Sequence, residues 1–147
     1  MEITEKSCGT VPYTVKDGVI YYLLIKTKDG RFCGFPKGHV EEGESEEQTA
    51  LRETWEETSL KPTITVGFRH EMLYGLRGGG KKRVVFFPAY FEGQLPKNNS
   101  DFEKFNYALL PFIEAYESLS FESNKQMLKK IDDFLKKINK KACECLF

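Results

Sequence analysis

Apolar residues along the first part of the chain come in short runs rich in Val, Ile, Tyr and Phe, and glycine-bearing turns separate these runs. Such runs are typical of β-strands, because β-branched and aromatic side chains pack well on a pleated surface. Asp17-Gly18 is the kind of dipeptide that closes a β-hairpin. Pro88 has no N–H for a sheet ladder, so its strand is expected at a sheet edge or with a bulge. The predicted strands are residues 8–15, 19–27, 63–74, 82–94 and 105–110.

Three segments carry the apolar period or the end signals of helices. Ser45 is followed three residues later by Gln48, a capping-box pattern that predicts a helix over about 45–58. A short helix is predicted over about 111–117, with proline at the favoured first position. A third is predicted over about 123–140, because apolar residues recur there at helical spacing and lysines fill much of the other face. We expect this last helix to pack on the sheet, and contact of its lysines with a membrane or RNA is the alternative.

The order of these elements indicates an α/β fold, and no repeat or linker interrupts it. The chain has 147 residues, of which 40% are hydrophobic and 30% charged. This length and balance fit one domain around one core. We therefore expect residues 1–147 to form a single α/β domain.

Positive and negative charges balance, since Lys plus Arg and Asp plus Glu each number 22. A net charge near zero argues against a protein that holds nucleic acid by bulk electrostatics, so no stable nucleic-acid partner is expected. The charge is unevenly spread: residues 41–57 are strongly acidic, while residues 77–83 and 125–141 are basic. This distribution fits a local acidic site that faces basic loops.

No stretch of the sequence approaches 18 apolar residues, so no membrane span is expected. The first ten residues lack the basic start and apolar run of a signal peptide. The cysteines have neither a zinc-ribbon spacing nor the pattern of a disulfide framework. We expect a cytoplasmic protein with reduced thiols at Cys8, Cys33, Cys143 and Cys145.

Three glutamates gather on one side of the predicted helix over 45–58. At about 100° per residue, Glu53, Glu56 and Glu57 fall within an arc of about 100°. Like charges at this spacing repel each other by roughly a few tenths of a kcal/mol per pair, so helix stability does not call for them. A hard divalent cation such as Mg²⁺, which binds carboxylate oxygens, would convert the repulsion into binding. A solvated acidic helix face is the alternative reading of the helix alone.

The turn before this helix adds a more specific pattern. Gly38 precedes Glu44 by six residues, and Arg52 follows Glu44 by eight. Together with the helix glutamates, these positions resemble the signature of the Nudix hydrolase family. Two positions depart from it: Thr54 is less apolar than usual, and Ser59 stands where the family has glycine. The matching residues are Gly38, Glu44, Arg52, Glu53, Glu56, Glu57 and Leu60.

Ser59 is the departure with a physical consequence. The glycine of the signature would be a left-handed helix C-cap, where a Cβ atom costs about 1 kcal/mol. Because the glycine supplies no side-chain ligand, Ser59 is expected to cost some stability and to leave the chemistry intact. A loop that opens at Ser59 would instead shift Glu57.

The resemblance implies an α/β/α sandwich around a mixed sheet and hydrolysis of a nucleoside diphosphate linked to another group. Mg²⁺ is the implied ion, with Mn²⁺ as the alternative, and the number of ions stays open. Glu53 would hold a metal-linked water or act as the base, Arg52 would orient Glu53, and Glu44 would support the set. The implied catalytic residues are Arg52, Glu53 and Glu57. The implied metal ligands are the Gly38 carbonyl, Glu53, Glu56 and Glu57.

Outside the signature the chain resembles one branch of this family, the asymmetrically cleaving diadenosine tetraphosphate hydrolases. The segment PKGHVEEGE at 36–44 is typical of that branch, and the likeness extends to residues 67–74 and 81–87. It implies a nucleotide substrate, diadenosine tetraphosphate, that water would cleave to ATP and AMP.

The same resemblance assigns residues outside the signature. It implies that Lys37 and Lys82 bind phosphate and that Tyr74 lies near the nucleotide. Phe86 could stack on a base, since stacking needs only the ring, although a place in the strand core is an equal alternative. Glu103 is the implied extra ligand or base on a late loop.

Other activities share this signature. The enzyme alternatives are a pyrophosphohydrolase of RNA 5′ ends, whose sequences resemble PKGHVE, a pyrophosphatase of oxidised nucleotides, and a hydrolase of diphosphoinositol polyphosphates. A non-catalytic nucleotide-sensing module is the alternative of another class. That module predicts a missing signature carboxylate, and none is missing. The sequence leaves the oligomeric state open.

The remaining prominent side chains near the signature are expected to be structural or solvated. Trp55 projects away from the glutamates and is expected to pack while partly exposed, with a base platform as the alternative. The expected structural histidines are His39 and His70. The expected solvated glutamates are Glu41, Glu42, Glu46 and Glu47.

Overall fold

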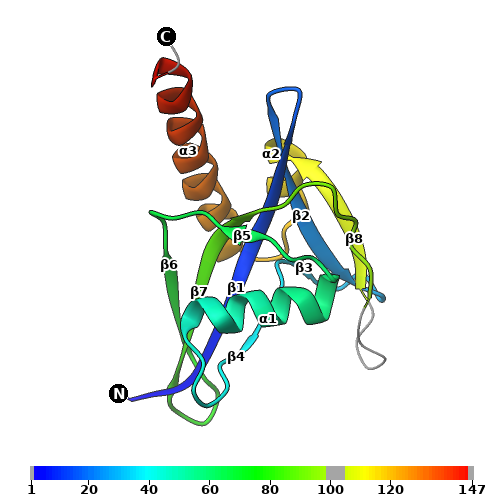
Figure 1. Cartoon of the computed structure of the whole chain (residues 1–147). Coiled ribbons are helices and arrows are strands. Elements are labelled where there is room, and N and C mark those ends of the chain that lie inside the picture. The colour runs from blue at the N-terminus through cyan, green and yellow to red at the C-terminus, as the bar shows by residue number, and fades with distance from the viewer. Residues whose placement is uncertain (1, 99–104, 146–147) are drawn as a thin grey trace.

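The computed structural model describes residues 2–98 and 105–145, and it contains one mixed β-sheet (Figure 1). β1 and β7 pair in parallel, and the other strand pairs of the described chain are antiparallel. The strand order is β3-β2-β1-β7-β5, with β4 beside β1, β6 beside β7 and β8 beside β2. The strands are β1 (Ile3–Lys16), β2 (Val19–Thr27), β3 (Cys33–Gly34), β4 (Lys37–His39), β5 (Thr63–Ile64), β6 (His70–Gly75), β7 (Lys81–Tyr90) and β8 (Phe105–Pro111).

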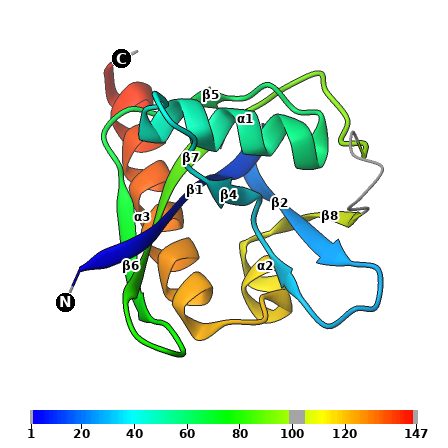
Figure 2. The same ribbon diagram turned by 90° about the horizontal axis from the view of Figure 1, so that it is seen from below.

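Helices cover both faces of this sheet, α1 on one face and α2 and α3 on the other (Figure 2). The alternation along β7 divides its side chains between the two layers. Val84 and Phe86 belong to the core cluster under α3, whereas Val85 and Phe87 pack with Ala50 of α1. The predicted α/β sandwich with a mixed sheet is therefore confirmed. The helices are α1 (Glu46–Thr58), α2 (Phe112–Ser118) and α3 (Glu122–Cys145).

The predicted start of α1 is confirmed in atomic detail. The Ser45 hydroxyl accepts the Gln48 backbone N–H at 3.1 Å, and the Gln48 side chain accepts the Ser45 N–H at 2.8 Å. This reciprocal pair satisfies two backbone groups that a helix start leaves open. It fixes where the helix begins, and thereby the rotation that sets its glutamates.

Two strand predictions are wrong in detail. The predicted strand over 63–74 divides into β5 and β6, and Gly67 between them has a φ of 107°. The strand predicted over 82–94 covers Lys81–Tyr90, and it is flanked on both sides rather than lying at an edge. The side of Pro88 that would carry an N–H faces the break between β5 and β6, where the Pro88 carbonyl accepts the N–H of Thr65. No strand pairs with Pro88 at this break, so the missing N–H is tolerated.

α2 follows the prediction closely, whereas α3 extends beyond the predicted end near residue 140, as far as Cys145. α2 begins one residue later than predicted, because Pro111 has an extended backbone and precedes the helix. α3 packs on the sheet, as predicted, through a row of side chains of which 2% or less is exposed. No helix in the described part of the chain is long and apolar enough to cross a membrane. The packed row consists of Met127, Leu128, Ile131 and Leu135.

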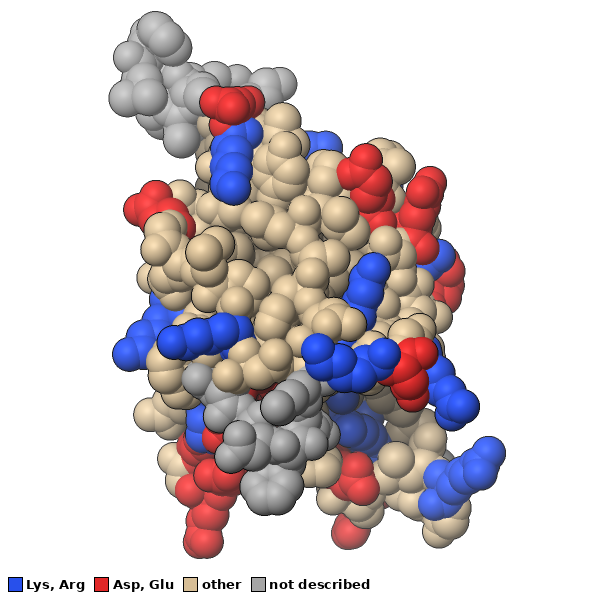
Figure 3. Space-filling view, turned by 90° about the vertical axis from the view of Figure 1, so that its right-hand side faces the viewer, with Lys and Arg blue, Asp and Glu red and all other residues tan. Residues whose placement is uncertain are grey.

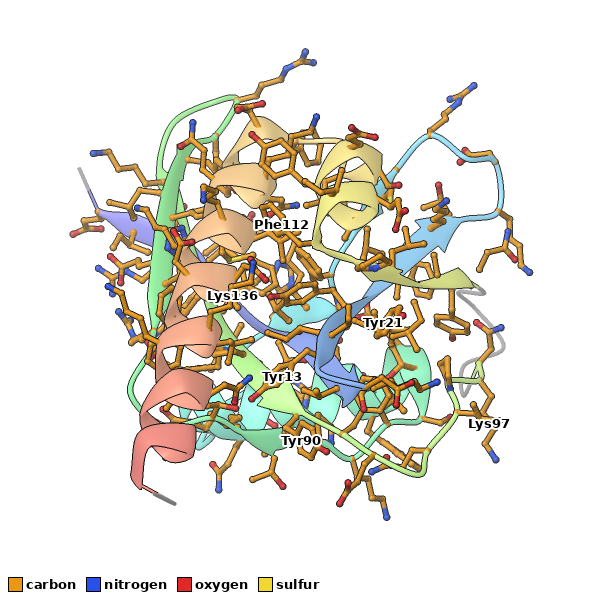
Figure 4. All side chains as sticks on the ribbon, turned by 90° about the horizontal axis from the view of Figure 1, so that it is seen from above. Tyr13, Tyr21, Tyr90, Lys97, Phe112 and Lys136 are labelled. Carbon is orange, nitrogen blue, oxygen red and sulfur yellow. The ribbon has the colours of Figure 1, made fainter. Side chains whose placement is uncertain are left out.

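Two tyrosines pack against each other near the C-terminal ends of the parallel strands β1 and β7. Tyr13 of β1 and Tyr90 of β7 lie side by side (Figure 4), with ring centroids 5.6 Å apart. The Tyr13 hydroxyl is also 2.7 Å from the hydroxyl of Thr65. The right-hand side of Figure 1 is a different kind of surface, where charged side chains surround an uncharged centre (Figure 3).

Candidate functional site

Arg52 organises the carboxylates of α1. Its Nε and Nη2 donate to the two oxygens of Glu44 at 2.7 and 3.0 Å, and its Nη1 donates to Glu53 Oε1 at 2.9 Å. The hydrogen bonds from Arg52 hold the pKa of Glu44 at about 2, and the same bonds raise the pKa of Arg52. Nη1 is also 3.3 Å from Glu56. The guanidinium therefore occupies a fixed position from which it orients Glu53.

Gly38 lies against the carboxyl group of Glu53. A Cβ atom at position 38 would come within 2.0 Å of Glu53 Cδ, so only glycine fits there. β4 brings this backbone to α1 through its antiparallel pairing with β1, where Cys8 faces Gly38. The neighbouring N–H of Lys37 donates to Glu57 Oε2 at 2.9 Å. Two consecutive residues of β4 thus contact two of the predicted ligands.

Glu53 is more enclosed than Glu56. Its side chain is 16% exposed, against 51% for Glu56. Burial raises the pKa of Glu53, and Arg52 opposes that change. The environment of Glu53 thus differs from that of a solvated helix face, which was the alternative for this helix.

The donor set fits Mg²⁺, although it is not a closed cage. In the described residues, no three acidic, histidine or cysteine side chains converge on one point that could hold a metal ion. Mg²⁺ usually keeps several waters and takes one or two carboxylates together with substrate phosphates, so a closed cage is not required. The close approach of the Gly38 backbone to the Glu53 carboxyl group matches that mode of binding.

The departures from the signature are both accommodated at the buried side of α1. Thr54 is fully buried. Its hydroxyl donates to the Ala50 carbonyl at 2.7 Å and is hydrogen-bonded to Thr10 Oγ1 at 2.7 Å. Ser59 caps the helix in the left-handed conformation predicted for the missing glycine, with φ 64° and ψ 10°. Its hydroxyl donates to the Lys97 carbonyl at 3.0 Å. The helix stays closed through Thr58, so the loop at Ser59 does not open.

Residues distant in the sequence hold the last turn of α1. The Lys97 N–H donates to the Thr58 carbonyl at 2.8 Å, and the Tyr107 hydroxyl donates to the Glu57 carbonyl at 2.5 Å. The same hydroxyl is 3.1 Å from Asn98 Oδ1. We call these contacts of Ser59, Lys97, Asn98 and Tyr107 the α1 latch. Sequence reasoning missed its members, because nothing near the signature marks a tyrosine that lies 50 residues later.

All four residues predicted to bind substrate line one cavity of about 500 Å³. Burial lowers the pKa of Lys37, and the positive charge of the nearby Lys82 lowers it further. Neither lysine forms an ion pair with a described residue. Two neighbouring cations without ion-pair partners suit an anionic ligand. We call this cavity the aromatic pocket, and it is lined by Phe32, Lys37, Tyr74, Lys82, Val84, Phe86, Phe121, Ser123 and Asn124.

The aromatic residues of this pocket differ in exposure. Phe86 is 2% exposed and packs edge to face on Phe35, so it belongs to the strand core and forms part of the pocket wall at once. Tyr74 and Phe121 are 39% and 56% exposed. Phe121 also lies 5.6 Å from Phe32, centroid to centroid. Sequence reasoning missed Phe32 and Phe121, because the chain brings them to the pocket from a loop and from the residue just before α3.

Other predictions near the signature have mixed outcomes. Glu46 is not solvated, because it binds Lys6 at 2.8 Å and Arg69 at 2.8 Å. Trp55 is 41% exposed, with the Lys61 ammonium 4.8 Å from its ring. His70 stacks on Phe68, outside the pocket lining. Glu103 lies outside the described residues and stays a prediction.

A family model of the NUDIX domain matches residues 9–134. The asymmetrical bis(5'-nucleosyl)-tetraphosphatase of Mus musculus is 31% identical over 140 residues, which cover 88% of this chain and 95% of that protein. The Caenorhabditis elegans protein of the same name is 30% identical over 138 residues, which cover 88% and 96%. The crystal structure of a C. elegans Ap4A hydrolase binary complex superimposes with a TM-score of 0.79 at 27% identity, over 90% of this chain and 98% of that one.

Proposed function

Because the chain belongs to the Nudix hydrolase family, we propose that its substrate is diadenosine tetraphosphate, which it cleaves with water to ATP and AMP in the presence of Mg²⁺. Membership makes the chain a pyrophosphohydrolase, an enzyme that cleaves a phosphoric anhydride bond. The choice of substrate within the family is the part that we propose.

The extent of the likeness to asymmetrical tetraphosphatases carries this proposal. The alignments cover 95% and 96% of the mouse and nematode proteins, far beyond the signature itself. They therefore include the strands and the helix start that line the aromatic pocket. A cavity with aromatic walls and two adjacent lysines also suits a substrate with bases and a chain of phosphates.

In the proposed mechanism, the metal would be held by Glu56, Glu57 and the Gly38 carbonyl. When bound, Mg²⁺ would neutralise phosphate charge and activate the attacking water. Glu53 would orient that water and is the candidate base, which its enclosure and its close approach to Gly38 support. Arg52 is a positioning residue. Its hydrogen bonds to Glu44 hold the guanidinium in place, and its Nη1 then donates to Glu53.

The aromatic pocket binds the rest of the substrate in this proposal. Lys37 and Lys82 contact the non-bridging phosphate oxygens, where they offset negative charge as water attacks. Tyr74 provides an exposed ring for a base, and Phe86 supports the pocket from the strand core. These roles require the phosphate chain to run from the pocket to the α1 glutamates, and Lys37 connects the two places through its N–H to Glu57.

Product analysis tests the proposal. With Mg²⁺, diadenosine tetraphosphate should give ATP and AMP in equal amounts, and EDTA should stop the reaction. Two molecules of ADP would reveal symmetrical cleavage, and absence of any product would reject this dinucleotide as the substrate. The Glu57→Gln variant should be inactive in the same assay, which would tie the reaction to the signature.

A further inference from the structure

β8 lies at one border of the sheet, and the backbone at its start points away from the neighbouring strand. Within the described chain β8 pairs with β2, and no further strand pairs with its other side (Figure 1). Thr27 of β2 faces Phe105 of β8, but its N–H donates to the Phe32 carbonyl at 3.0 Å, away from β8. The N–H of Phe105 donates to Asn98 Oδ1 at 2.7 Å, and its carbonyl accepts the Asn98 side-chain amide at 3.3 Å. Both backbone groups of Phe105 are therefore on the outer side of β8.

This orientation of Phe105 determines which later residues of β8 have outward backbone groups. Along an antiparallel strand, residues alternate between the two sides, so Tyr107 and Leu109 also point their N–H and C=O groups outward. Among residues 2–98 and 105–145, no hydrogen bond to these outward groups is found. Asn98 occupies the edge at Phe105, and Pro111 has no N–H to offer at the other end. The open stretch is therefore Tyr107–Leu109, with Ala108 at its centre.

The edge formed by β8 lacks the usual protection against pairing. Edge strands are normally guarded by lysines, inward-pointing charges or bulges. The segment FNYALLPFI at 105–113 has no charged residue, and β8 pairs with β2 without a bulge. Figure 3 views the right-hand side of Figure 1, where β8 lies, and charged side chains surround its uncharged centre. Leu95, which lines a cavity together with Leu109, is 86% exposed and adds apolar surface. Such an edge is suited to pairing with another strand.

We propose that β8 pairs with β8 of a second copy of this chain, antiparallel about a two-fold axis at Ala108. Tyr107 of each copy then lies opposite Leu109 of the other, and each such pair exchanges both of its N–H···O bonds. Ala108 meets its own copy at the axis, where Cα atoms are about 4.5 Å apart and a small side chain fits. A shift by two residues would place an open residue against Phe105, which Asn98 occupies, or against Pro111. The register at Ala108 is thus the one that satisfies every open group.

Charges at the two ends of β8 fit the same antiparallel arrangement. At its start, the exposed Lys28 donates from Nζ to Asn106 Oδ1 at 2.9 Å. Just beyond its end, Glu114 is exposed in the first turn of α2. Because Asn106 lies opposite Leu110 of the partner, Lys28 of each copy comes near Glu114 of the other. Parallel pairing would instead bring like charges together, so the edge is complementary to itself when one copy is reversed.

Amide hydrogen exchange at increasing protein concentration, followed by NMR, tests the proposed register. The amides of Tyr107 and Leu109 should exchange more slowly as the concentration rises, because they become bonded only in the dimer. The amide of Ala108 is the internal control, since it points toward β2 and should be protected at every concentration. Sedimentation velocity on the same samples should show the dimer form. A protein that stays monomeric, or a dimer in which the exchange of Tyr107 and Leu109 is unchanged, would overturn the inference.

Leu109→Pro removes the outward N–H without removing a bond to β2. The dissociation constant of the dimer should rise by at least about 10-fold, because a hydrogen bond is lost on each side of the axis. Leu109→Val is the matched control, since it alters the side chain and keeps the N–H. Thermal unfolding confirms that both variants are folded. A folded Leu109→Pro variant that dimerises as well as Leu109→Val would contradict the proposed pairing.

A charge-reversal cycle at exposed positions tests the same arrangement without changing the strand. Lys28→Glu and Glu114→Lys should each weaken the dimer by about 5-fold, because each sets like charges together on both sides of the axis. The double variant restores opposite charges and should dimerise about as well as the wild-type protein. A double variant no better than the single ones would reject the antiparallel register. No step of this test uses the proposed substrate, so the dimer and the substrate can each fail alone.

Discussion

Glu56 and Glu57 are neighbours on one helix, yet their surroundings differ. Glu57 accepts the backbone N–H of Lys37, and its own carbonyl accepts the Tyr107 hydroxyl. Glu56 is half exposed and lies near the guanidinium of Arg52. As proposed metal ligands they need full negative charge, which an amide does not carry.

Glu56→Gln and Glu57→Gln should therefore each lower kcat by at least about 100-fold, because each removes part of the charge that holds the metal. Steady-state kinetics with Mg²⁺ measures this effect, and thermal unfolding checks the fold. Glu47→Gln is the control, since Glu47 is exposed in the first turn of the same helix. Near-normal rates in both variants would rule out the proposed metal site.

Replacement of Gly38 by alanine should displace the Glu53 carboxyl group without removing any functional side chain. An added Cβ would lie 2.0 Å from Glu53 Cδ, so the carboxyl group must move. A displacement of about 1 Å in a reacting group can cost about 100-fold, and we expect kcat/KM of Gly38→Ala to fall by that order. Gly75→Ala is the matched control, because nothing lies within 4 Å of its added Cβ. Equal activity of the two variants would contradict the close approach.

At the scale of elements, α1 depends on contacts at both ends. The capping box fixes its start, and the α1 latch fixes its last turn, from which Glu57 projects. The left-handed conformation of Ser59 costs about 1 kcal/mol because of its Cβ atom. The hydrogen bond from the Ser59 hydroxyl to the Lys97 carbonyl contributes about 1 kcal/mol of stability, which offsets this cost. This balance explains how the signature tolerates serine in place of glycine without displacement of the helix end.

Tyr107→Phe tests the latch. Loss of the hydroxyl should lower the free energy of unfolding by about 1 kcal/mol, because the Glu57 carbonyl loses a partner. The looser helix end should also raise the Mg²⁺ concentration needed for the half-maximal rate. Tyr21→Phe is the control, because the Tyr21 hydroxyl has no hydrogen bond in the described part of the chain. An unchanged Mg²⁺ requirement would show that the latch has no influence on the site.

Local signals explain which elements the sequence could predict. The start of α1 and the hairpin at Asp17-Gly18 depend on adjacent residues, and both are found as expected. The division of 63–74 into two strands depends on pairing with β7, which no local pattern reveals. The central position of Pro88 has the same origin, since its tolerance depends on a break in a neighbouring strand.

At the scale of the whole molecule, Glu46 joins three parts of the fold. Its carboxylate on α1 binds Lys6 of β1 and Arg69 in the segment before β6. The hydrogen bond from Arg69 is the main cause that lowers the pKa of Glu46 from 4.5 to about 2. The contribution of this carboxylate to stability is therefore complete above pH 4.5 and is lost as the pH falls toward 2.

Glu46→Gln should accordingly lower stability at pH 7, and its difference from the wild-type protein should shrink between pH 4.5 and 2. Denaturant unfolding across this pH range measures the difference. Glu47→Gln, next to it in the first turn, should show little effect at any pH. A Glu46→Gln deficit that does not change with pH would contradict the ionic role.

The signature predicted the site glutamates, but not the residues from other segments that hold them in place. A fixed spacing on one helix specifies which glutamates share a side, and the resemblance extended this to Lys37, Tyr74, Lys82 and Phe86 in the pocket. The remaining pocket residues and the latch come from segments that meet only through the folded sheet. Tyr107 belongs to this group, because its role depends on what faces it across the fold.

The most direct test of the central claim is a comparison of kcat/KM, with Mg²⁺, for diadenosine tetraphosphate, RNA with a 5′ triphosphate, and oxidised dGTP. The proposed function predicts the highest value for diadenosine tetraphosphate, because the aromatic pocket and the adjacent lysines suit a dinucleotide with a phosphate chain. A higher value for the RNA or for the oxidised nucleotide would contradict the proposed substrate.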